Sequence, residues 1–233
     1  MERRQFLIGG AAGVAAIAAA QTAAQPETAP PPPIAAPASS SDAPTYQILT
    51  ATEVAFMSAM ADSMIPADSL SPSGTDCGVV VFVDRQLAGS YGAGARLYRA
   101  GPFQPAGSGQ GYQLPLTPLE FFRAGIAAAD RWSRKTTGKA FDRLAEADRV
   151  KAMKDMESGK AEFENFSAKA FFAACLQIVM EGFFSDPIYG GNRDKTSWRM
   201  IGYPGLPATY ADKIEAYRGK RFEAEPQSIA DFS

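Results

Sequence analysis

The sequence predicts an all-α fold: an irregular helical bundle with long, ordered loops rich in aromatic residues, glycine and proline. Two capping-box tetrapeptides, Thr50-Ala51-Thr52-Glu53 and Thr117-Pro118-Leu119-Glu120, each open a segment whose apolar residues recur at helical spacing. Two long connections, residues 90–116 and 181–205, show little regular pattern but carry many aromatic residues. Disordered segments are poor in aromatics, so we expect these connections to be ordered.

The first helix follows Thr50, with an apolar stripe behind its capping box, and Pro66 stops it. Residues 76–89 fit two interpretations. Val79 to Val83 has the composition of a strand, but the apolar spacing through Leu87 fits a helix that Asp76 caps and Gly89 ends, and we prefer the helix. The Asp84-Arg85 pair on that helix is expected to lie on a solvated face.

The second capping box predicts a long helix from Thr117 to near Gly138, whose basic last turn suits the helix dipole. A short helical piece around Phe141 and a helix over 146–158 follow. Ser167 then caps an apolar helix that Gly182 is expected to end.

A last short helix is predicted over residues 209–218, with Tyr210, Ile214 and Tyr217 on one side.

Four parts are expected along the chain: residues 1–24 as a twin-arginine signal peptide, 25–44 as a Pro/Ala/Ser-rich linker, 45–222 as the helical domain and 223–233 as a C-terminal tail. The export signal rests on Arg3, Arg4, Phe6 and Leu7, followed by an apolar run diluted with glycine and alanine. That run is weaker than the about 20 strongly apolar residues that span a bilayer. A short membrane anchor is the alternative.

Composition excludes several classes of protein. The 233 residues contain no histidine, which removes Ser-His-Asp triads, histidine-ligated zinc and histidine-held haem. A net charge of -2 does not indicate the excess of positive charge that nucleic-acid binding needs. Cys77 and Cys175 are too far apart for a C-x-x-C motif, and a disulfide between them, a bond from either to a partner, and free thiols all remain open. We therefore expect no cofactor and no metal in this chain and no catalytic residue.

The aromatic loops are candidates for a partner interface, since rigid aromatic and arginine side chains are typical interface anchors. Packing against their own domain is the equal alternative. Gly190 and Gly191 are expected to take a positive φ or to allow a close backbone approach. The candidate interface residues are Tyr98, Phe103, Tyr112, Phe183, Phe184, Asp186, Pro187, Tyr189, Gly190, Gly191, Asn192, Arg193, Trp198 and Tyr203.

Residues 50 to 210 resemble the gluconate 2-dehydrogenase subunit 3 family, the small (gamma) subunits of membrane-bound sugar and sugar-acid dehydrogenases. The features that carry the likeness are the twin-arginine start and the segments ADSMIP (61–66), CGVVVFVDRQLAGSYG (77–92), YRAGPF (98–103), GYQLPLTP (111–118), EGFFSDPIYGGNRD (181–194) and WRMIGYPG (198–205). The resemblance implies a complex with an FAD-dependent catalytic large subunit and a multi-haem cytochrome c subunit, which carries haem c and attaches the complex to the membrane.

These observations lead to one main hypothesis. The chain is expected to be a non-catalytic small subunit that stabilises the FAD subunit and escorts it through the twin-arginine translocase to the periplasm, at the inner membrane. A stand-alone periplasmic ligand-binding protein or enzyme, using the aromatic loops as a pocket, is the alternative.

Overall fold

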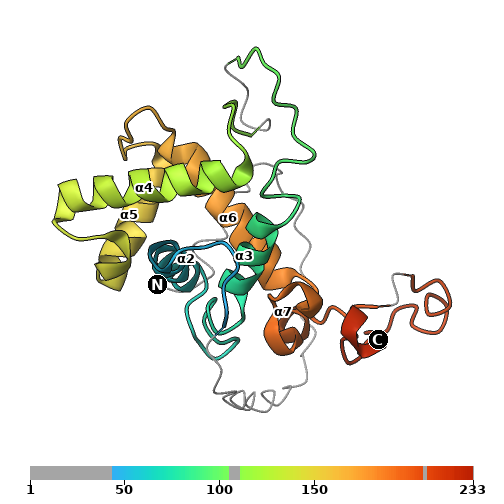
Figure 1. Ribbon diagram of the computed structural model, residues 1–233. Helices are drawn as coiled ribbons and strands as arrows, with labels where there is room; N and C mark the ends of the chain where they lie inside the picture. The colour runs from blue at the N-terminus through green and yellow to red at the C-terminus, as the bar shows by residue number, and fades with distance from the viewer. Residues whose placement is uncertain (1–43, 105–110, 207–208, 233) are drawn as a thin grey trace, which may run out of the picture. The chain divides into compact units, whose positions relative to one another are not determined.

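The computed structural model describes residues 44–104, 111–206 and 209–232. Its helices are α2 (Ala51–Met64), α3 (Val79–Ala88), α4 (Pro118–Thr137), α5 (Glu146–Ser158), α6 (Ala168–Phe184) and α7 (Thr196–Ile201) (Figure 1). Four short 3-10 helices join them: η2 (Phe141–Arg143), η3 (Pro187–Tyr189), η4 (Arg193–Lys195) and η5 (Ile229–Phe232). The described ranges contain two isolated β-bridges and no strand, so the all-α prediction is confirmed.

All described residues belong to one compact unit of the chain. The predicted signal residues Arg3, Arg4, Phe6 and Leu7 lie outside the described residues, as does the predicted linker up to residue 43. Within the described part, no helix combines the length and the apolar character needed to cross a membrane.

Both predicted capping boxes are formed. The Thr50 hydroxyl accepts from the Glu53 amide at 3.3 Å, and the Thr50 amide donates to the Glu53 carboxylate at 2.7 Å. Thr117 and Glu120 repeat the pattern at 3.2 and 2.8 Å. Because each box satisfies two amide donors that a helix start leaves unpaired, α2 and α4 begin where the sequence predicts.

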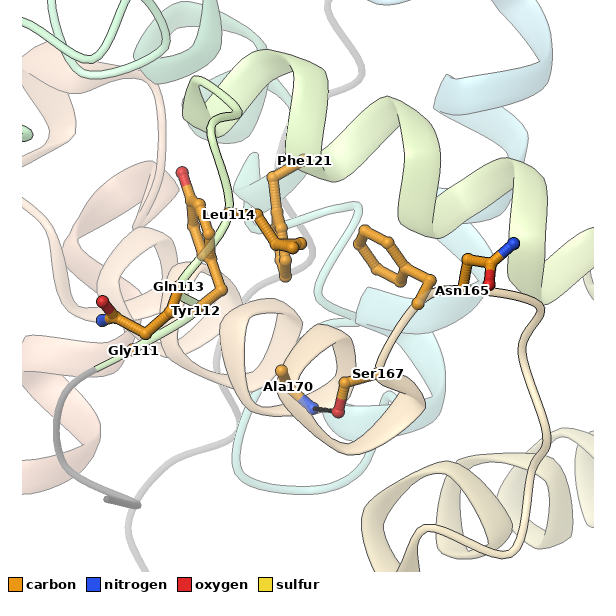
Figure 2. A pocket seen from close by; sticks show the side chains of 9 residues that line it. Gly111, Tyr112, Gln113, Leu114, Phe121, Asn165, Ser167 and Ala170 are labelled. Carbon is orange, nitrogen blue, oxygen red and sulfur yellow. Dashed lines mark hydrogen bonds between the residues drawn. The ribbon is translucent and has the colours of Figure 1, made fainter. Parts of the chain in front are cut away.

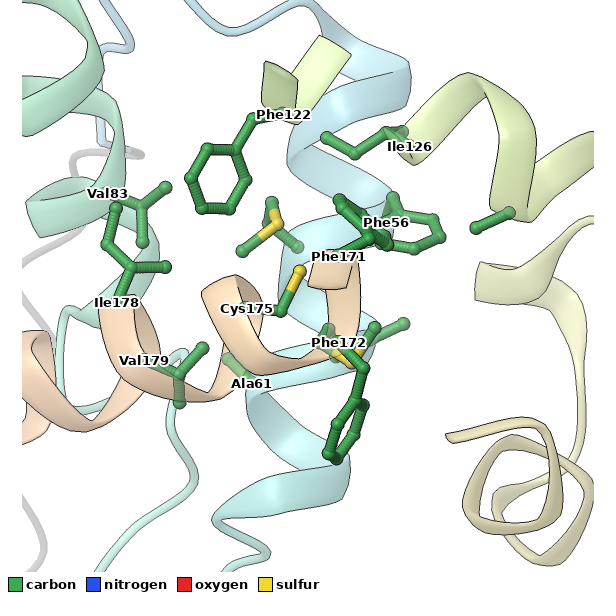
Figure 3. Close-up of a cluster of buried hydrophobic side chains, with 14 of the residues drawn as sticks. Phe56, Ala61, Val83, Phe122, Ile126, Phe171, Phe172, Cys175, Ile178 and Val179 are labelled. Atoms are coloured by element: carbon green, nitrogen blue, oxygen red, sulfur yellow. The ribbon is translucent and has the colours of Figure 1, made fainter. Parts of the chain in front are cut away.

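The core lies where α2, α3, α4 and α6 meet (Figure 3). Phe56, Phe122 and Phe171 fill its centre, and none is more than 1% exposed. Burying each such ring stabilises the fold by about 1.5–3 kcal/mol. Gly125 lets α4 approach α6 closely, since a Cβ at that position would lie 2.1 Å from a ring carbon of Phe171. The helical interpretation of residues 76–89 is confirmed, because α3 packs into this core as a helix.

Two helix ends differ from prediction. Asp76 does not cap α3: its carboxylate accepts from the Ser73 hydroxyl at 3.0 Å within the preceding turn, and Gly78, at φ +81°, precedes the first residue of the helix. Gly182 does not end α6, which continues to Phe184. Gly182 is an interior contact position, since a Cβ there would lie 2.9 Å from the ring of Phe82.

The helix predicted over residues 209–218 is wrong: the described residues of this segment form a series of turns. Ile214, placed on the predicted apolar side, is 62% exposed. Tyr210 and Tyr217 pack instead against Phe222, with ring centroids 5.8 and 4.7 Å apart. A helix of about ten residues is marginal in water without a packed face, and this segment reaches no core.

Candidate interaction site

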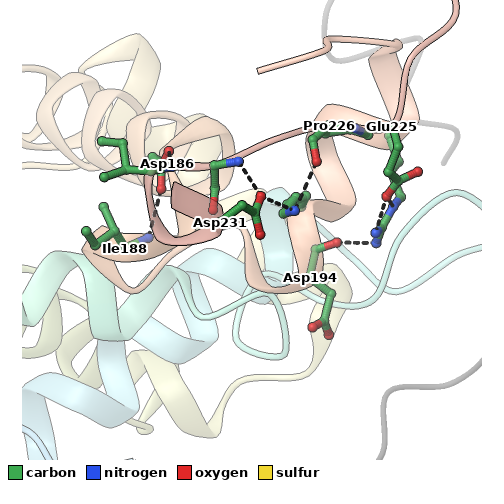
Figure 4. Close-up of polar contacts among 10 residues, drawn as sticks. Asp186, Ile188, Asp194, Glu225, Pro226 and Asp231 are labelled. Atoms are coloured by element: carbon green, nitrogen blue, oxygen red, sulfur yellow. Dashed lines mark hydrogen bonds and ion pairs between the residues drawn. The ribbon is translucent and has the colours of Figure 1, made fainter. Parts of the chain in front are cut away.

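Asp186 organises the segment that follows α6. One carboxylate oxygen accepts from the Ile188 amide at 3.0 Å, which starts η3. The other oxygen accepts from the Ile229 amide at 2.9 Å, 43 residues further along the chain. A single carboxylate therefore ties η3 to η5 (Figure 4).

A second set of contacts fastens residues 225–232, the C-terminal strap, to the same segment (Figure 4). Lys195 Nζ lies 2.6 Å from Asp231 Oδ2 and donates to the Pro226 carbonyl at 2.9 Å. The hydrogen bond from Lys195 holds the pKa of the Asp231 carboxyl below its usual value. Arg199 pairs with Glu225 at the start of the strap. The strap is thus held at both its ends.

Backbone hydrogen bonds hold the middle of the strap. The Leu206 amide donates to the Gln227 carbonyl at 2.9 Å, and the Gln227 amide donates to the Pro204 carbonyl at 3.0 Å. Gly205 permits this approach, because a Cβ there would lie 2.1 Å from the Gln227 carbonyl oxygen.

The two 3-10 helices that Asp186 joins expose four large apolar side chains, which we call the apolar patch. Ile188 and Tyr189 of η3 are 44% and 49% exposed, and Ile229 and Phe232 of η5 are 41% and 65% exposed. Single exposed apolar residues are ordinary on a protein surface, but a group on two adjoining, fixed turns is typical of an interaction site.

Three of the predicted interface side chains lie inside the domain, in addition to the buried Gly191. Trp198 is 6% exposed, and its indole N–H donates to the Phe184 carbonyl at 2.9 Å. Asn192 is fully buried; its carbonyl oxygen accepts from the amide and the hydroxyl of Ser197 at 2.9 and 2.7 Å. Phe183 is 4% exposed. These side chains shape the segment from within.

The other predicted residues divide by exposure. Tyr98, at 82%, and Tyr203, at 44%, are exposed together with Tyr189 and Arg193. Tyr112 is half-buried and stacks on Phe121 with ring centroids 4.0 Å apart. The remaining half-buried residues are Phe103, Phe184, Asp186, Pro187 and Gly190, while Gly191 is buried.

The conformational prediction for the glycine pair is confirmed. Gly190 has φ +101° directly after Tyr189, and a Cβ on Gly191 would lie 2.0 Å from the Gly182 carbonyl oxygen. The pair turns the chain back against the end of α6, which sets the direction in which Tyr189 leaves the surface.

A hollow of about 340 Å³ lies between the loop at residues 111–114 and the start of α6 (Figure 2). Tyr112, Phe121 and Phe166 line it together with the α6 cap Ser167. Burial raises the pKa of Tyr112 to about 12, so its hydroxyl stays protonated near neutral pH. Its lining side chains are uncharged, which suits an apolar group more than acid-base chemistry.

The two cysteines are buried thiols, and no disulfide joins them in the described structure. Cys175 faces the core between α2 and α6, as its apolar helix face predicts (Figure 3). Burial raises its pKa far above the ordinary thiol value. Cys77, 1% exposed, places its sulfur 3.7 Å from the Pro72 carbonyl oxygen.

The expectation of a solvated face for Asp84-Arg85 is wrong for Asp84, while Arg85 is exposed as expected. Asp84 is 1% exposed, and its carboxylate accepts from the amides of Gln47, Ile48 and Leu49 at 2.7, 3.0 and 2.9 Å. The buried carboxylate therefore anchors the chain that enters α2. Its position three residues before Leu87 on an apolar helix face was the sequence signal for burial.

The family model described as gluconate 2-dehydrogenase subunit 3 matches residues 51–205, two thirds of the chain. The chain belongs to this family. The resemblance found in the sequence motifs is confirmed, and this member of the gluconate 2-dehydrogenase subunit 3 family is a subunit of a dehydrogenase complex. The match includes the segment from α6 to Gly205 and ends before the C-terminal strap. No curated protein and no solved structure matches the chain.

Proposed function

We propose that this chain is the non-catalytic small subunit of a periplasmic, membrane-associated sugar or sugar-acid dehydrogenase, which stabilises the FAD-containing catalytic subunit and escorts it through twin-arginine export. Electrons from the sugar would pass from FAD to a multi-haem cytochrome c subunit that attaches the complex to the inner membrane. Family membership supports the place in a dehydrogenase complex. The paired Arg3 and Arg4 support the export route.

The apolar patch is the observation that carries the proposed contact with the catalytic subunit. Its two 3-10 helices are joined by Asp186 and braced by the Lys195–Asp231 ion pair before any partner binds. Association then orders few additional side chains, so more of the buried apolar area contributes to affinity. Aromatic and large aliphatic side chains at the centre of such a contact are the usual source of binding energy.

Export is tested by co-expressing this chain with the FAD-binding dehydrogenase encoded beside it. Replacing Arg3 and Arg4 with lysine is expected to keep both proteins out of the periplasm, as judged by immunoblots of fractionated cells and by dye-linked dehydrogenase activity. An active catalytic subunit that still reaches the periplasm would refute the escort role. The purified chain alone is expected to oxidise no sugar; turnover by it would favour the stand-alone enzyme.

The contact is tested by replacing Tyr189 and Phe232 with alanine. Each change should weaken binding of the catalytic subunit by about 2 kcal/mol, because each removes a fixed, exposed apolar anchor. Ile214→Ala is the matched control, since that side chain is 62% exposed on the turns at residues 211–219. Titration calorimetry measures the affinity of each of the three variants for the catalytic subunit. Equal affinities across the three variants and the unaltered chain would show that the apolar patch does not contact the catalytic subunit.

A further inference from the structure

A second exposed feature is a group of charged residues around the C-terminal end of α4. Between residues 131 and 143 the chain has five arginine or lysine residues and a single aspartate, although its net charge is -2. All five cations are exposed, and we call them the basic face: Arg131, Arg134, Lys135, Lys139 and Arg143.

The helix dipole explains only part of this positive charge. Arg134 and Lys135 occupy the last turn of α4, where cations stabilise the carboxyl end of a helix. That effect decays within the last turn. Lys139 and Arg143 lie beyond the end of the helix, so another reason is needed for them.

Three of the five cations line a shallow hollow of about 560 Å³. Arg134, Lys139 and Arg143 line it, above a floor that includes Ala51 and Ala55 of α2. Asp142 also lines the hollow and pairs with Arg143 at 2.9 Å, which offsets one of the charges. The ion pairs found among the described residues leave Arg131, Arg134, Lys135 and Lys139 unpaired.

The chemistry of the basic face differs from that of a protein-binding patch. The centre of a protein interface is depleted of lysine, and its arginines stand among aromatic side chains. None of the large apolar side chains that the described structure exposes lines this hollow. A face made of flexible cations with no apolar anchor is suited to a water-rich layer of negative charge, as phospholipid headgroups form.

We propose that the basic face binds the anionic phospholipid headgroups of a membrane surface, with a headgroup phosphate seated in the hollow between Arg134 and Lys139. This contact would be additional to the attachment through a cytochrome subunit. The contact needs no apolar insertion, because each cation near an anionic surface contributes attraction of its own. Salt screens this attraction.

The test uses the purified full chain and sedimentation with vesicles of phosphatidylglycerol and phosphatidylcholine in equal parts. Vesicles of phosphatidylcholine alone measure binding that does not depend on anionic lipid, and any contribution of residues 1–43 is the same in all variants, since all share them. The variant Arg134→Gln, Lys135→Gln, Lys139→Gln should bind the anionic vesicles roughly a hundredfold more weakly.

The matched control is Arg218→Gln, Lys220→Gln, Arg221→Gln, which removes the same charge from exposed residues of the turns near the C-terminal strap. It should bind within about twofold of the unaltered chain. Equal loss in the two triple variants would overturn the proposal, because net charge alone would then explain binding.

Salt provides a test that needs no variant. Binding of the unaltered chain to anionic vesicles should fall steeply as the salt concentration rises. Binding that does not change with salt concentration would overturn the proposal. So would an unaltered chain that does not bind the vesicles, together with a basic-face variant that no longer binds the catalytic subunit. The last result would assign the face to an acidic protein and would leave the escort function intact.

Discussion

Replacing Asp84 with asparagine tests how the chain is anchored to α3. An asparagine oxygen can still accept from the amides of Ile48 and Leu49, which share Oδ1 in the native structure. Its amide group would then face the Gln47 amide, which lies 2.7 Å from Oδ2, and two donors would oppose one another. Hydrogen bonds to a charged acceptor contribute about 1.5–3 kcal/mol each, and those to a neutral acceptor about 0.5–1.5 kcal/mol.

We therefore expect Asp84→Asn to lower the free energy of unfolding by about 3 kcal/mol, with one bond lost and two weakened. For a domain of this size the melting temperature should fall by about 6–12 °C. Urea denaturation measures the loss, and hydrogen exchange should show faster exchange at the amides of residues 47–49.

Asp76→Asn is the control for that measurement. Asp76 is an exposed carboxylate on the same stretch of chain that accepts from the Ser73 hydroxyl, and its replacement should cost less than about 0.5 kcal/mol. If Asp84→Asn costs less than about 1 kcal/mol, the three amide bonds do not anchor the chain and the reasoning fails.

Three further predictions follow from the described contacts. Gly125→Ala should destabilise the fold by about 1–3 kcal/mol in urea titrations despite the better helix propensity of alanine, because its Cβ would lie 2.1 Å from Phe171; an unchanged midpoint would contradict this. Cys175 should resist maleimide in the native protein and react after unfolding, as peptide mass spectrometry can show, since burial raises its pKa and excludes the reagent; rapid native labelling would be inconsistent with the core position. Asp231 should titrate below its usual value of 3.8 by carboxyl NMR, so the stabilisation it provides is complete above that pH and is lost as the pH falls through the lowered pKa. Lys195→Gln should move that midpoint back toward 3.8, and an unmoved midpoint would refute the role of the ion pair.

The sequence predicted best what depends on neighbours along the chain. The capping boxes at Thr50 and Thr117, and the helix end at Gly138, depend on local chemistry, and the structure has them where expected. The end of α6 was missed because Gly182 meets Phe82, a contact between residues a hundred positions apart.

The candidate site was harder to predict for the same reason. Aromatic residues in an irregular segment identify a packed loop, but the side on which each ring packs is decided by distant residues. Trp198 turned inward to bond Phe184, whereas Tyr189 remained half exposed. The contribution of Ile229 and Phe232 could not be foreseen, because only the fold brings η5 beside Asp186. Which side chains contact a partner stays a prediction.

The bond between Asp186 and the Ile229 amide also orders events during synthesis. A ribosome that has just added residue 186 must add 43 more before that bond can close, which takes on the order of seconds at about 5–20 residues per second. The helices α2 to α6 can fold in that interval, while the surface shared by η3 and η5 cannot. Translation thus completes the apolar patch last, so under the proposed function the catalytic subunit would bind only after the helices have folded.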